Sequence, residues 1–292
     1  MRTKTSFNRL KMVTDNHGGE LVSVIFNDHE YLWQGDPTYW AGQAPILFPI
    51  VGALPGGELM AAAGPCRMGR HGIVQKRDFR LYEKTPISDT YEFVADEESK
   101  AAYPYDFRLL VKYIIISGNA IETRFYVENT GDVDLPFVLG GHPAFNLPLG
   151  GDDCDFSDYY LKFKSPMTAD TMRLDENGIF KADETVRVLD NSDRLPLSHA
   201  LFENDALCLS NVPKFSVTLM SDKSSHGITM DFEEMPYLGV WSAKGDAPFV
   251  ALEPWLGHSS TTADDGVFEH KAGMIMLKPG DARSFSFTMT FF

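Results

Sequence analysis

The sequence predicts an all-β protein, a single domain spanning residues 1–292 and built as a large antiparallel β-sandwich. Short runs of β-branched and aromatic residues recur along the whole chain, and turn residues separate them at short intervals. The 24 glycines and 17 prolines are spread through these turns and never gather into a linker. Many short antiparallel strands at this spacing are typical of a sandwich, and no repeat or low-complexity segment divides the chain.

The strongest local signal is a β-hairpin. Phe107–Ser117 and Ala120–Asn129 are apolar, β-branched runs joined by Gly118-Asn119, a two-residue turn of the kind that closes hairpins. In the second run, residues suited to a core alternate with charged or polar residues, and this period of two places one face on a core and the other in water. The predicted buried face consists of Ile121, Thr123, Phe125 and Val127.

Further strands are predicted from shorter runs of the same composition. In the last of them, Phe and Met alternate with Ser and Thr, which is the pattern of a half-buried strand. One short helix is predicted at residues 96–102, just before Tyr103-Pro104. The predicted strands cover residues 20–26, 135–139, 206–210, 215–220, 227–232, 237–241, 248–252, 274–277 and 283–291.

The net charge of −15 at pH 7 disfavours nucleic acids and anionic membrane surfaces as partners, because their phosphates repel an acidic surface. The three cysteines, Cys66, Cys154 and Cys208, contain no C-x-x-C pair. The chain begins without the apolar run of a secretory signal, and it has no stretch of eighteen apolar residues. These features predict a cytoplasmic protein with reduced thiols.

A first candidate site residue is His142, in the run Gly-Gly-His-Pro-Ala-Phe-Asn-Leu-Pro at residues 140–148. Pro143 favours an extended conformation for His142. The two glycines before it allow the backbone to bend or a ligand to approach closely. The pattern fits a rigidly held functional histidine, and it fits equally a histidine that only makes a hydrogen bond in a loop.

A second candidate is Glu253, in an apolar strand that ends in Glu-Pro-Trp at residues 253–255. A carboxylate in this setting is partly desolvated and held in one geometry, which suits a general base. The alternative is a glutamate that caps a neighbouring backbone group or pairs with an arginine.

A third segment places a histidine among basic residues. His71 is followed by a glycine, and the surrounding cations either bind an oxygen-rich ligand or form an exposed, solvated loop. The basic residues are Arg67, Arg70, Lys76 and Arg77.

The motifs favour chemistry without a metal or cofactor. His71, His142 and Glu253 would be a valid zinc set, but no H-E-x-x-H pair fixes two ligands at once. The chain has no G-x-S-x-G elbow, no phosphate-binding G-x-x-x-x-G-K-[ST] loop and no G-x-G-x-x-G fingerprint.

Six segments, taken in order, resemble the aldose 1-epimerase (galactose mutarotase) superfamily. The likeness is to its branch of mutarotase-related proteins, which a lactose-operon accessory protein typifies. The His-Pro-Ala-Phe and Glu-Pro-Trp pieces are the more specific ones. The segments span essentially the whole chain and lie at residues 45–52, 71–73, 140–148, 201–207, 236–242 and 252–255.

The resemblance implies a β-supersandwich and an isomerase that interconverts the α and β anomers of a free sugar without a cofactor. It implies that His142 is the general acid and Glu253 the general base. It also implies that His71 binds the sugar near its ring oxygen. Asp205 would hold a sugar hydroxyl, or Asn204 if the alignment shifts by one residue.

Two departures from the resemblance concern the substrate. Relatives carry Arg where this chain has Ala53, and they often carry Arg soon after the His-Gly pair, where this chain reads Ile-Val-Gln at residues 73–75. A non-catalytic sugar-binding protein and a mutarotase for a sugar phosphate are therefore alternative functions; the second would use the basic residues around His71. Phe145, Trp241 and Trp255 are candidates either for stacking on the sugar ring or for core packing.

Overall fold

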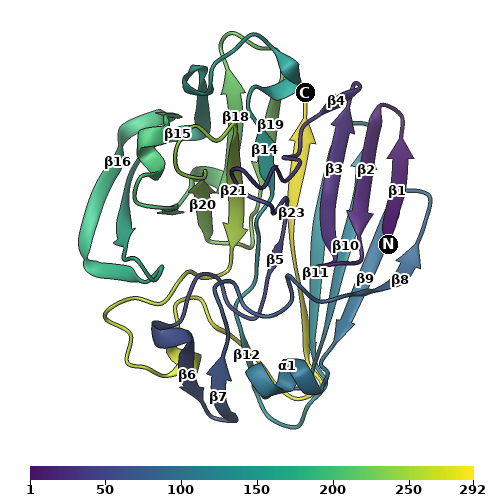
Figure 1. The fold of residues 1–292 in the computed structure, drawn as a ribbon, viewed down its shortest axis with the longest axis vertical. Coiled ribbons are helices and arrows are strands. Elements are labelled where there is room, and N and C mark those ends of the chain that lie inside the picture. Colours follow the sequence, from purple (N-terminus) through teal and green to yellow (C-terminus); the bar gives the residue numbers. More distant parts are fainter.

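The computed structural model describes residues 1–292 as strands in five antiparallel sheets, with one short α-helix (Figure 1). The all-β antiparallel architecture that the sequence predicts is confirmed. The nine-stranded sheet contains, in spatial order, β16 (Phe180–Pro196), β15 (Tyr159–Leu174), β18 (Ser216–Ser221), β19 (Gly227–Asp231), β23 (Ala282–Phe291), β11 (Ala120–Asn129), β10 (Phe107–Ser117), β9 (Ser88–Val94) and β8 (Arg80–Lys84).

Four smaller sheets complete the fold. A six-stranded sheet contains β17 (Leu207–Ser210), β20 (Tyr237–Trp241), β21 (Phe249–Trp255), β13 (Gly140–Gly141) and β5 (Ile46–Leu47), with β14 (Ala144–Asn146) also paired to β21. A four-stranded sheet contains β1 (Arg2–Phe7), β2 (Leu10–Asp15), β3 (Glu20–Phe26) and β4 (His29–Glu30). Two-stranded sheets pair β12 (Leu135–Phe137) with β22 (Ile275–Leu277) and β6 (Glu58–Ala61) with β7 (Gly64–Arg67).

Helical structure is confined to short pieces. The α-helix α1 (Glu97–Ala102) lies where the sequence predicts it, and Asp96 and Ser99 form a reciprocal capping box at its start. No helix has the length and apolar character that crossing a membrane would need. Single 3-10 turns lie at Pro55–Gly57, Leu149–Gly151, Phe156–Asp158, His199–Phe202, Pro213–Phe215 and Phe268–His270.

The four-stranded and six-stranded sheets cover the same face of the nine-stranded sheet, which gives the sandwich its two layers (Figure 1). Tyr113 and Phe287 project from the large sheet toward Leu21 of β3 and Ile46 of β5, and Tyr113 donates a 2.8 Å hydrogen bond to the Gly19 carbonyl. A connected cluster of 72 buried apolar residues fills the space between the layers. This cluster is the main stabilising feature, because apolar burial is the dominant favourable term in folding.

The predicted hairpin is confirmed with its register. β10 and β11 pair from Phe107 opposite Asn129 to Ile115 opposite Ile121, with an irregularity just before the turn. The predicted inward face of β11 is buried, as is that of the last strand, β23.

The longest hairpin was not predicted. β15 and β16 pair with four shifts of register, so their side chains do not keep a regular period of two. β16 lies at the edge of the sheet and most of its side chains are exposed, so it lacks the apolar pattern of a buried strand.

Two predicted strands differ from the observed ones near the candidate residues. The strand expected at 135–139 ends at Phe137, and β13 then begins at Gly140 in a different sheet. The strand expected at 248–252 continues to Trp255, so Glu253 lies inside β21 and not after its end. Both differences bring the predicted motifs into the six-stranded sheet.

The glycine after His71 lies in a tight crossing of two segments. Gly72 has φ = +87°, and a Cβ on it would lie 2.1 Å from the Phe48 carbonyl oxygen. His71 itself has φ = +70°, and its carbonyl accepts a 3.2 Å hydrogen bond from the Phe48 amide. This crossing fixes the position of His71.

Replacing Gly72 with alanine is expected to destabilise the protein by at least ~2 kcal/mol more than replacing Gly56, because the new methyl group meets backbone atoms. Gly56 also has a positive φ, of +60°, but a Cβ there has no neighbour within 4 Å. Gly56→Ala is therefore the matched control, because it introduces the backbone strain without the crowding. Urea unfolding gives the free energy of unfolding of both variants. Equal losses of stability would contradict the crowding at Gly72.

Candidate active site

Strand register brings the two predicted catalytic residues together. β13 and β14 both pair with β21, with Gly140 opposite Trp255 and Ala144 opposite Ala251. His142 lies between these two pairs, and the same register places it opposite Glu253. Opposed residues of paired strands point to the same face of a sheet, so the two side chains meet.

The His142–Glu253 pair is buried and in contact. His142 Nε2 lies 3.2 Å from Glu253 Oε1, and the residues are 6% and 1% exposed. The second carboxyl oxygen of Glu253 accepts a 3.2 Å hydrogen bond from the Trp255 indole N–H. Trp255 is two residues further along the same strand, so it projects from the same face and fixes the carboxyl group.

Glycines make room for the aromatic rings that surround this pair. A Cβ on Gly140 would lie 2.6 Å from the Trp255 ring, and one on Gly239 would lie 2.2 Å from it. A Cβ on Gly141 would lie 2.7 Å from the Phe287 ring in the core. The Gly-Gly pair before His142 therefore leaves room for protein side chains on both faces of β13. The sequence had suggested a backbone bend or the close approach of a ligand at this position.

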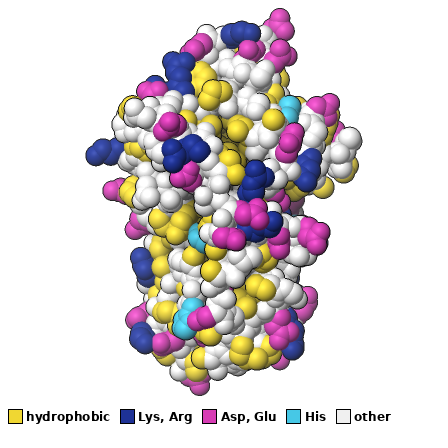
Figure 2. Space-filling model, turned by 90° about the vertical axis from the view of Figure 1, so that its left-hand side faces the viewer, with side chains coloured by type: hydrophobic (Ala, Val, Ile, Leu, Met, Phe, Trp, Pro, Cys, Tyr) yellow, Lys and Arg dark blue, Asp and Glu magenta, His cyan; other side chains and the backbone are white.

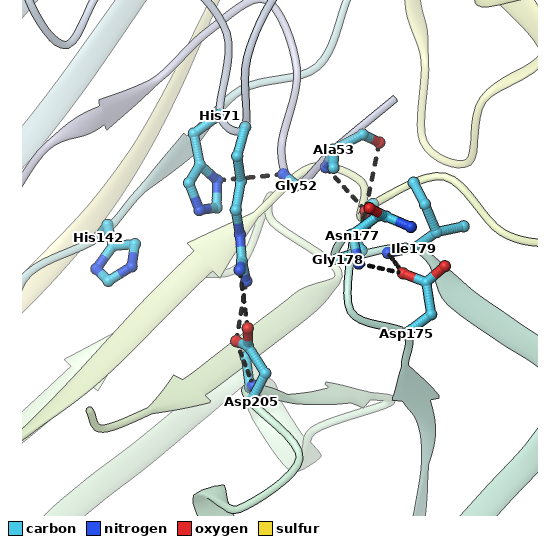
Figure 3. A network of polar contacts seen from close by, with 12 residues as sticks. Gly52, Ala53, His71, His142, Asp175, Asn177, Gly178, Ile179 and Asp205 are labelled. Atoms are coloured by element: carbon cyan, nitrogen blue, oxygen red, sulfur yellow. Dashed lines mark hydrogen bonds and ion pairs between the residues drawn. The ribbon is translucent and has the colours of Figure 1, made fainter. Parts of the chain in front are cut away.

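His71 lies beside His142 with its tautomer set by the backbone. Its Nδ1 accepts a 3.2 Å hydrogen bond from the Gly52 amide (Figure 3), so the proton of the neutral ring is on Nε2. The His71 and His142 ring centroids are 5.7 Å apart, with the ring planes nearly perpendicular. His71 therefore has an N–H donor available for a ligand.

Asp205 is bound to an arginine at the pocket. Its two oxygens accept hydrogen bonds of 2.8 and 2.9 Å from the two terminal nitrogens of Arg70 (Figure 3). Arg70 lines the same pocket as His71, His142 and Glu253, whereas Asp205 and the exposed Asn204 line a neighbouring hollow. Asp205 thus reaches the pocket through Arg70.

The position of the missing arginine, Ala53, is covered by the turn between β15 and β16. The Ala53 amide donates to Ser259 Oγ at 2.8 Å, and Ser259 Oγ donates to the Gly178 carbonyl at 2.5 Å (Figure 3). Asp175 stabilises the turn by accepting hydrogen bonds from the Asn177 and Ile179 amides, of 2.8 and 2.9 Å. A Cβ on Gly178 would lie 3.6 Å from that of Ala53, so this turn occupies the space beside residue 53.

These residues enclose a pocket of about 200 Å³. Trp40, from the loop before β5, stacks on the His142 ring with centroids 4.9 Å apart, and the Trp241 ring meets His142 edge-on at 5.5 Å. Of the three aromatic residues singled out in the sequence, Trp241 and Trp255 line the pocket, and Phe145 is fully buried in the core. Trp40 was missed, because it lies in a long loop outside every motif.

Of the four basic residues around His71, Arg70 alone lines the pocket. Arg67 pairs with Glu58 at 2.5 Å on the β6–β7 hairpin, and Arg77 pairs with Asp96 and with Glu98. Acidic and basic side chains are interspersed over the face drawn in Figure 2. The predicted basic cluster is therefore dispersed in the folded chain.

Burial sets the protonation of the central pair. It raises the pKa of Glu253 well above the ordinary carboxyl value, although the nearby Arg70 charge acts in the opposite direction. It lowers the pKa of His142 to about 3 and holds the pKa of His71 well below 6.5. The two groups thus have opposite pKa shifts and lie in direct contact inside the pocket, an arrangement that is common in acid–base sites.

No group of three or more His, Cys, Asp or Glu side chains in the structure has the arrangement of a metal site. His258 is buried outside the pocket, where its Nδ1 lies 2.8 Å from the Ser259 carbonyl and its ring packs against Tyr237. Its burial and these contacts identify His258 as a structural residue.

The fold is that of the aldose 1-epimerase family. The family model for aldose 1-epimerase matches residues 3–290, so the chain belongs to this family, and the predicted resemblance is confirmed.

Similar proteins of known sequence or structure support this family assignment. The chain is 37% identical over 283 residues to the plasmid form of protein LacX from Lactococcus lactis subsp. lactis, covering 94% of this chain and 93% of that protein. A galactose mutarotase-related enzyme from Lactobacillus acidophilus matches with a TM-score of 0.94 and 31% identity, over 100% of this chain and 97% of that one. A galactose mutarotase-like protein from Lactobacillus casei matches with a TM-score of 0.91 and 27% identity over 100% of both chains.

Replacing Glu253 with glutamine is expected to make the protein more stable at neutral and alkaline pH. The pKa of Glu253 in the folded chain lies above its ordinary value of 4.5, so its contribution to stability is present below pH 4.5 and is lost as the pH rises. The difference in free energy of unfolding between E253Q and the parent should therefore grow with pH, by up to about 1.4 kcal/mol per pH unit.

Urea unfolding at pH 5, 6, 7 and 8 measures this difference. Glu122→Gln, on the outer face of β11 beside Arg124, is the control and should show a difference that does not change with pH. A constant difference for E253Q as well would contradict a raised pKa for Glu253.

Proposed function

We propose that this protein is a mutarotase that interconverts the α and β anomers of a free, uncharged sugar, with His142 as general acid and Glu253 as general base. The observation that carries the proposal is the 3.2 Å separation of His142 Nε2 and Glu253 Oε1 inside the pocket. The anomeric hydroxyl oxygen and the ring oxygen are both bonded to C1 of a cyclic sugar. An acid and a base that serve these two oxygens at once must lie side by side.

The reaction needs two proton transfers and no net change in the protein. Glu253 takes the proton of the anomeric hydroxyl while His142 gives its Nε2 proton to the ring oxygen, and the C1–ring oxygen bond breaks to leave an open-chain aldehyde. Rotation about the C1–C2 bond exposes the other face of the carbonyl. The ring hydroxyl then returns its proton to His142, its oxygen attacks C1, and Glu253 returns its proton to the new anomeric oxygen.

The resting pair supplies the starting state for these transfers. In this mechanism a proton moves from Glu253 to His142 across the 3.2 Å contact, which gives the carboxylate and imidazolium that ring opening needs. Each positioned proton transfer contributes a factor of ~10²–10⁴ in rate.

The remaining pocket residues fit a sugar. His71 has an Nε2–H donor available beside His142, a position that suits a sugar oxygen near the reacting centre. Trp40 and Trp241 border the pocket and offer apolar faces to the C–H side of a pyranose ring. These contacts bind the ring while leaving C1 at the acid–base pair.

The proposal takes residues 1–292 as one domain acting in the cytoplasm. A connected hydrophobic core supports the single domain. The three cysteines are free, and Cys66 and Cys208 are buried, which suits a reducing compartment.

His142→Asn and Glu253→Gln are each expected to slow anomer exchange by about 10²-fold or more, because each removes one of the two proton transfers. Polarimetry and NMR exchange spectroscopy on a panel of free hexoses and pentoses measure the rate. Both variants should still bind the sugar, since Arg70, His71 and the tryptophans remain.

The controls are His270→Asn and Glu122→Gln, which change the same residue types outside the pocket and should exchange anomers at the parent rate. Parent-like exchange by H142N or E253Q would remove that residue from the mechanism. Sugar binding by the parent without any acceleration would replace the enzyme with a non-catalytic sugar-binding protein.

A further inference from the structure

The pocket contains one cationic side chain, and a carboxylate already holds it. Arg70 donates from both terminal nitrogens to the two oxygens of Asp205, at 2.8 and 2.9 Å. These two parallel hydrogen bonds, called the fork below, fix the orientation of the guanidinium plane as well as its distance from the Asp205 carboxylate. Arg70 therefore presents a fixed orientation to whatever enters the pocket.

Most of the hydrogen-bonding capacity of Arg70 is unused. A guanidinium has five N–H donors, and the two bonds to Asp205 leave three of them without a protein acceptor. The Arg70 carbonyl, in contrast, accepts a 3.3 Å hydrogen bond from the Gln75 side chain, which anchors the residue in the pocket wall. Donors left free in a pocket wall are suited to the oxygens of a ligand.

The turn that covers Ala53 lies beside the guanidinium. A Cβ added to Gly178 would be at van der Waals distance, 3.7 Å from Cζ of Arg70 and 3.6 Å from Cβ of Ala53. A larger residue at 178 would press on Arg70, and its φ of +78° favours glycine there. The Arg70 side chain is 42% exposed, so its orientation depends on the fork with Asp205 and not on burial.

The charge balance of the pocket is unfavourable to anions. Asp205 neutralises Arg70, Glu253 adds a second carboxyl group, and desolvation lowers the pKa of both His71 and His142, so neither histidine supplies a fixed positive charge. A phosphorylated ligand would meet no uncompensated cation here, whereas neutral hydroxyl oxygens would find free N–H donors. The ion pair thus favours hydroxyl groups over phosphate.

We propose that Arg70 is the specificity-determining residue, which binds neutral sugar hydroxyls in this pocket, and that Asp205 is a positioning residue acting through Arg70 to select free sugars over sugar phosphates. The inference rests on the proposed function for the identity of its ligand as a sugar. It also gives Asp205 an indirect role, where the sequence resemblance implied a direct contact with a sugar hydroxyl.

The decisive variant is Asp205→Asn, which keeps the side-chain shape and removes the compensating charge. Two effects are expected. The KM for free hexoses should rise about 10-fold, because Arg70 loses its charge-assisted fork. Inorganic phosphate, which should leave the parent unaffected at 10 mM, should become a competitive inhibitor of D205N with an inhibition constant at least about 10-fold lower than in the parent.

Arg70 variants separate positioning from charge. Arg70→Gln should raise KM about 10-fold or more with a smaller change in kcat, and it should show no inhibition by phosphate in either the parent or the D205N background. Arg70→Lys should restore the charge without the fork and rescue KM only in part. If Asp205 acts through Arg70, D205N should have no further effect on KM in the R70Q background.

Glu58→Gln, which breaks the comparable Glu58–Arg67 ion pair on β6–β7, is the control and should change neither KM nor phosphate inhibition. Parent-like KM in R70Q would overturn the proposal, as would a full D205N effect retained in the R70Q background. Phosphate inhibition of the parent equal to that of D205N would also overturn it.

The affinities of the same variants for D-galactose and D-glucose, measured by calorimetry, test the role of Arg70 in binding independently of catalysis. Arg70-dependent hexose binding by a parent that does not accelerate anomer exchange would reject the proposed function and support the role of Arg70. If the parent accelerates anomer exchange and R70Q binds hexoses as tightly as the parent does, the proposed function is supported and the role of Arg70 is rejected.

Discussion

The site depends on one register: β13 and β14 both pair with β21, and the residue between them, His142, lies opposite Glu253. This register places two ionisable side chains on the same buried face, 3.2 Å apart. Neither group has another charged partner within a salt-bridge distance. A slip of one residue in either strand would turn the side chain of that strand to the other face and separate the pair.

The surroundings of this pair show how the fold accommodates it. Trp255 reaches Glu253 only because Gly140 and Gly239 leave room for its ring on either side. Trp40 and Trp241 then cover His142, which excludes water and makes charge on either group costly. A buried carboxyl group that shares its proton lowers stability in return for reactivity, a trade that is common at active sites.

A second ion pair gives the pocket its selectivity in our interpretation. Arg70 and Asp205 are far apart in the sequence and meet at the pocket wall in a two-bond fork. The missing arginine at residue 53 is explained in the same region, because the β15–β16 turn fills the space beside Ala53. Ser259 links Ala53 to the turn, because its hydroxyl group is hydrogen-bonded both to the Ala53 amide and to the Gly178 carbonyl. The one cationic side chain that lines the pocket, Arg70, is therefore paired with a carboxylate, that of Asp205.

Alternation, turn chemistry and ordered motifs are local properties, so the all-β class, the β10–β11 hairpin, the capped helix and the family could all be predicted from the sequence alone. It also identified His142, Glu253 and His71 as residues that meet in one pocket. The folded structure was needed to show that Asp205 reaches the pocket through Arg70, that Trp40 covers His142, and that the β15–β16 turn lies beside Ala53. Those contacts join segments separated by 100 residues or more, and no local pattern encodes which distant partner a charge or a ring will meet.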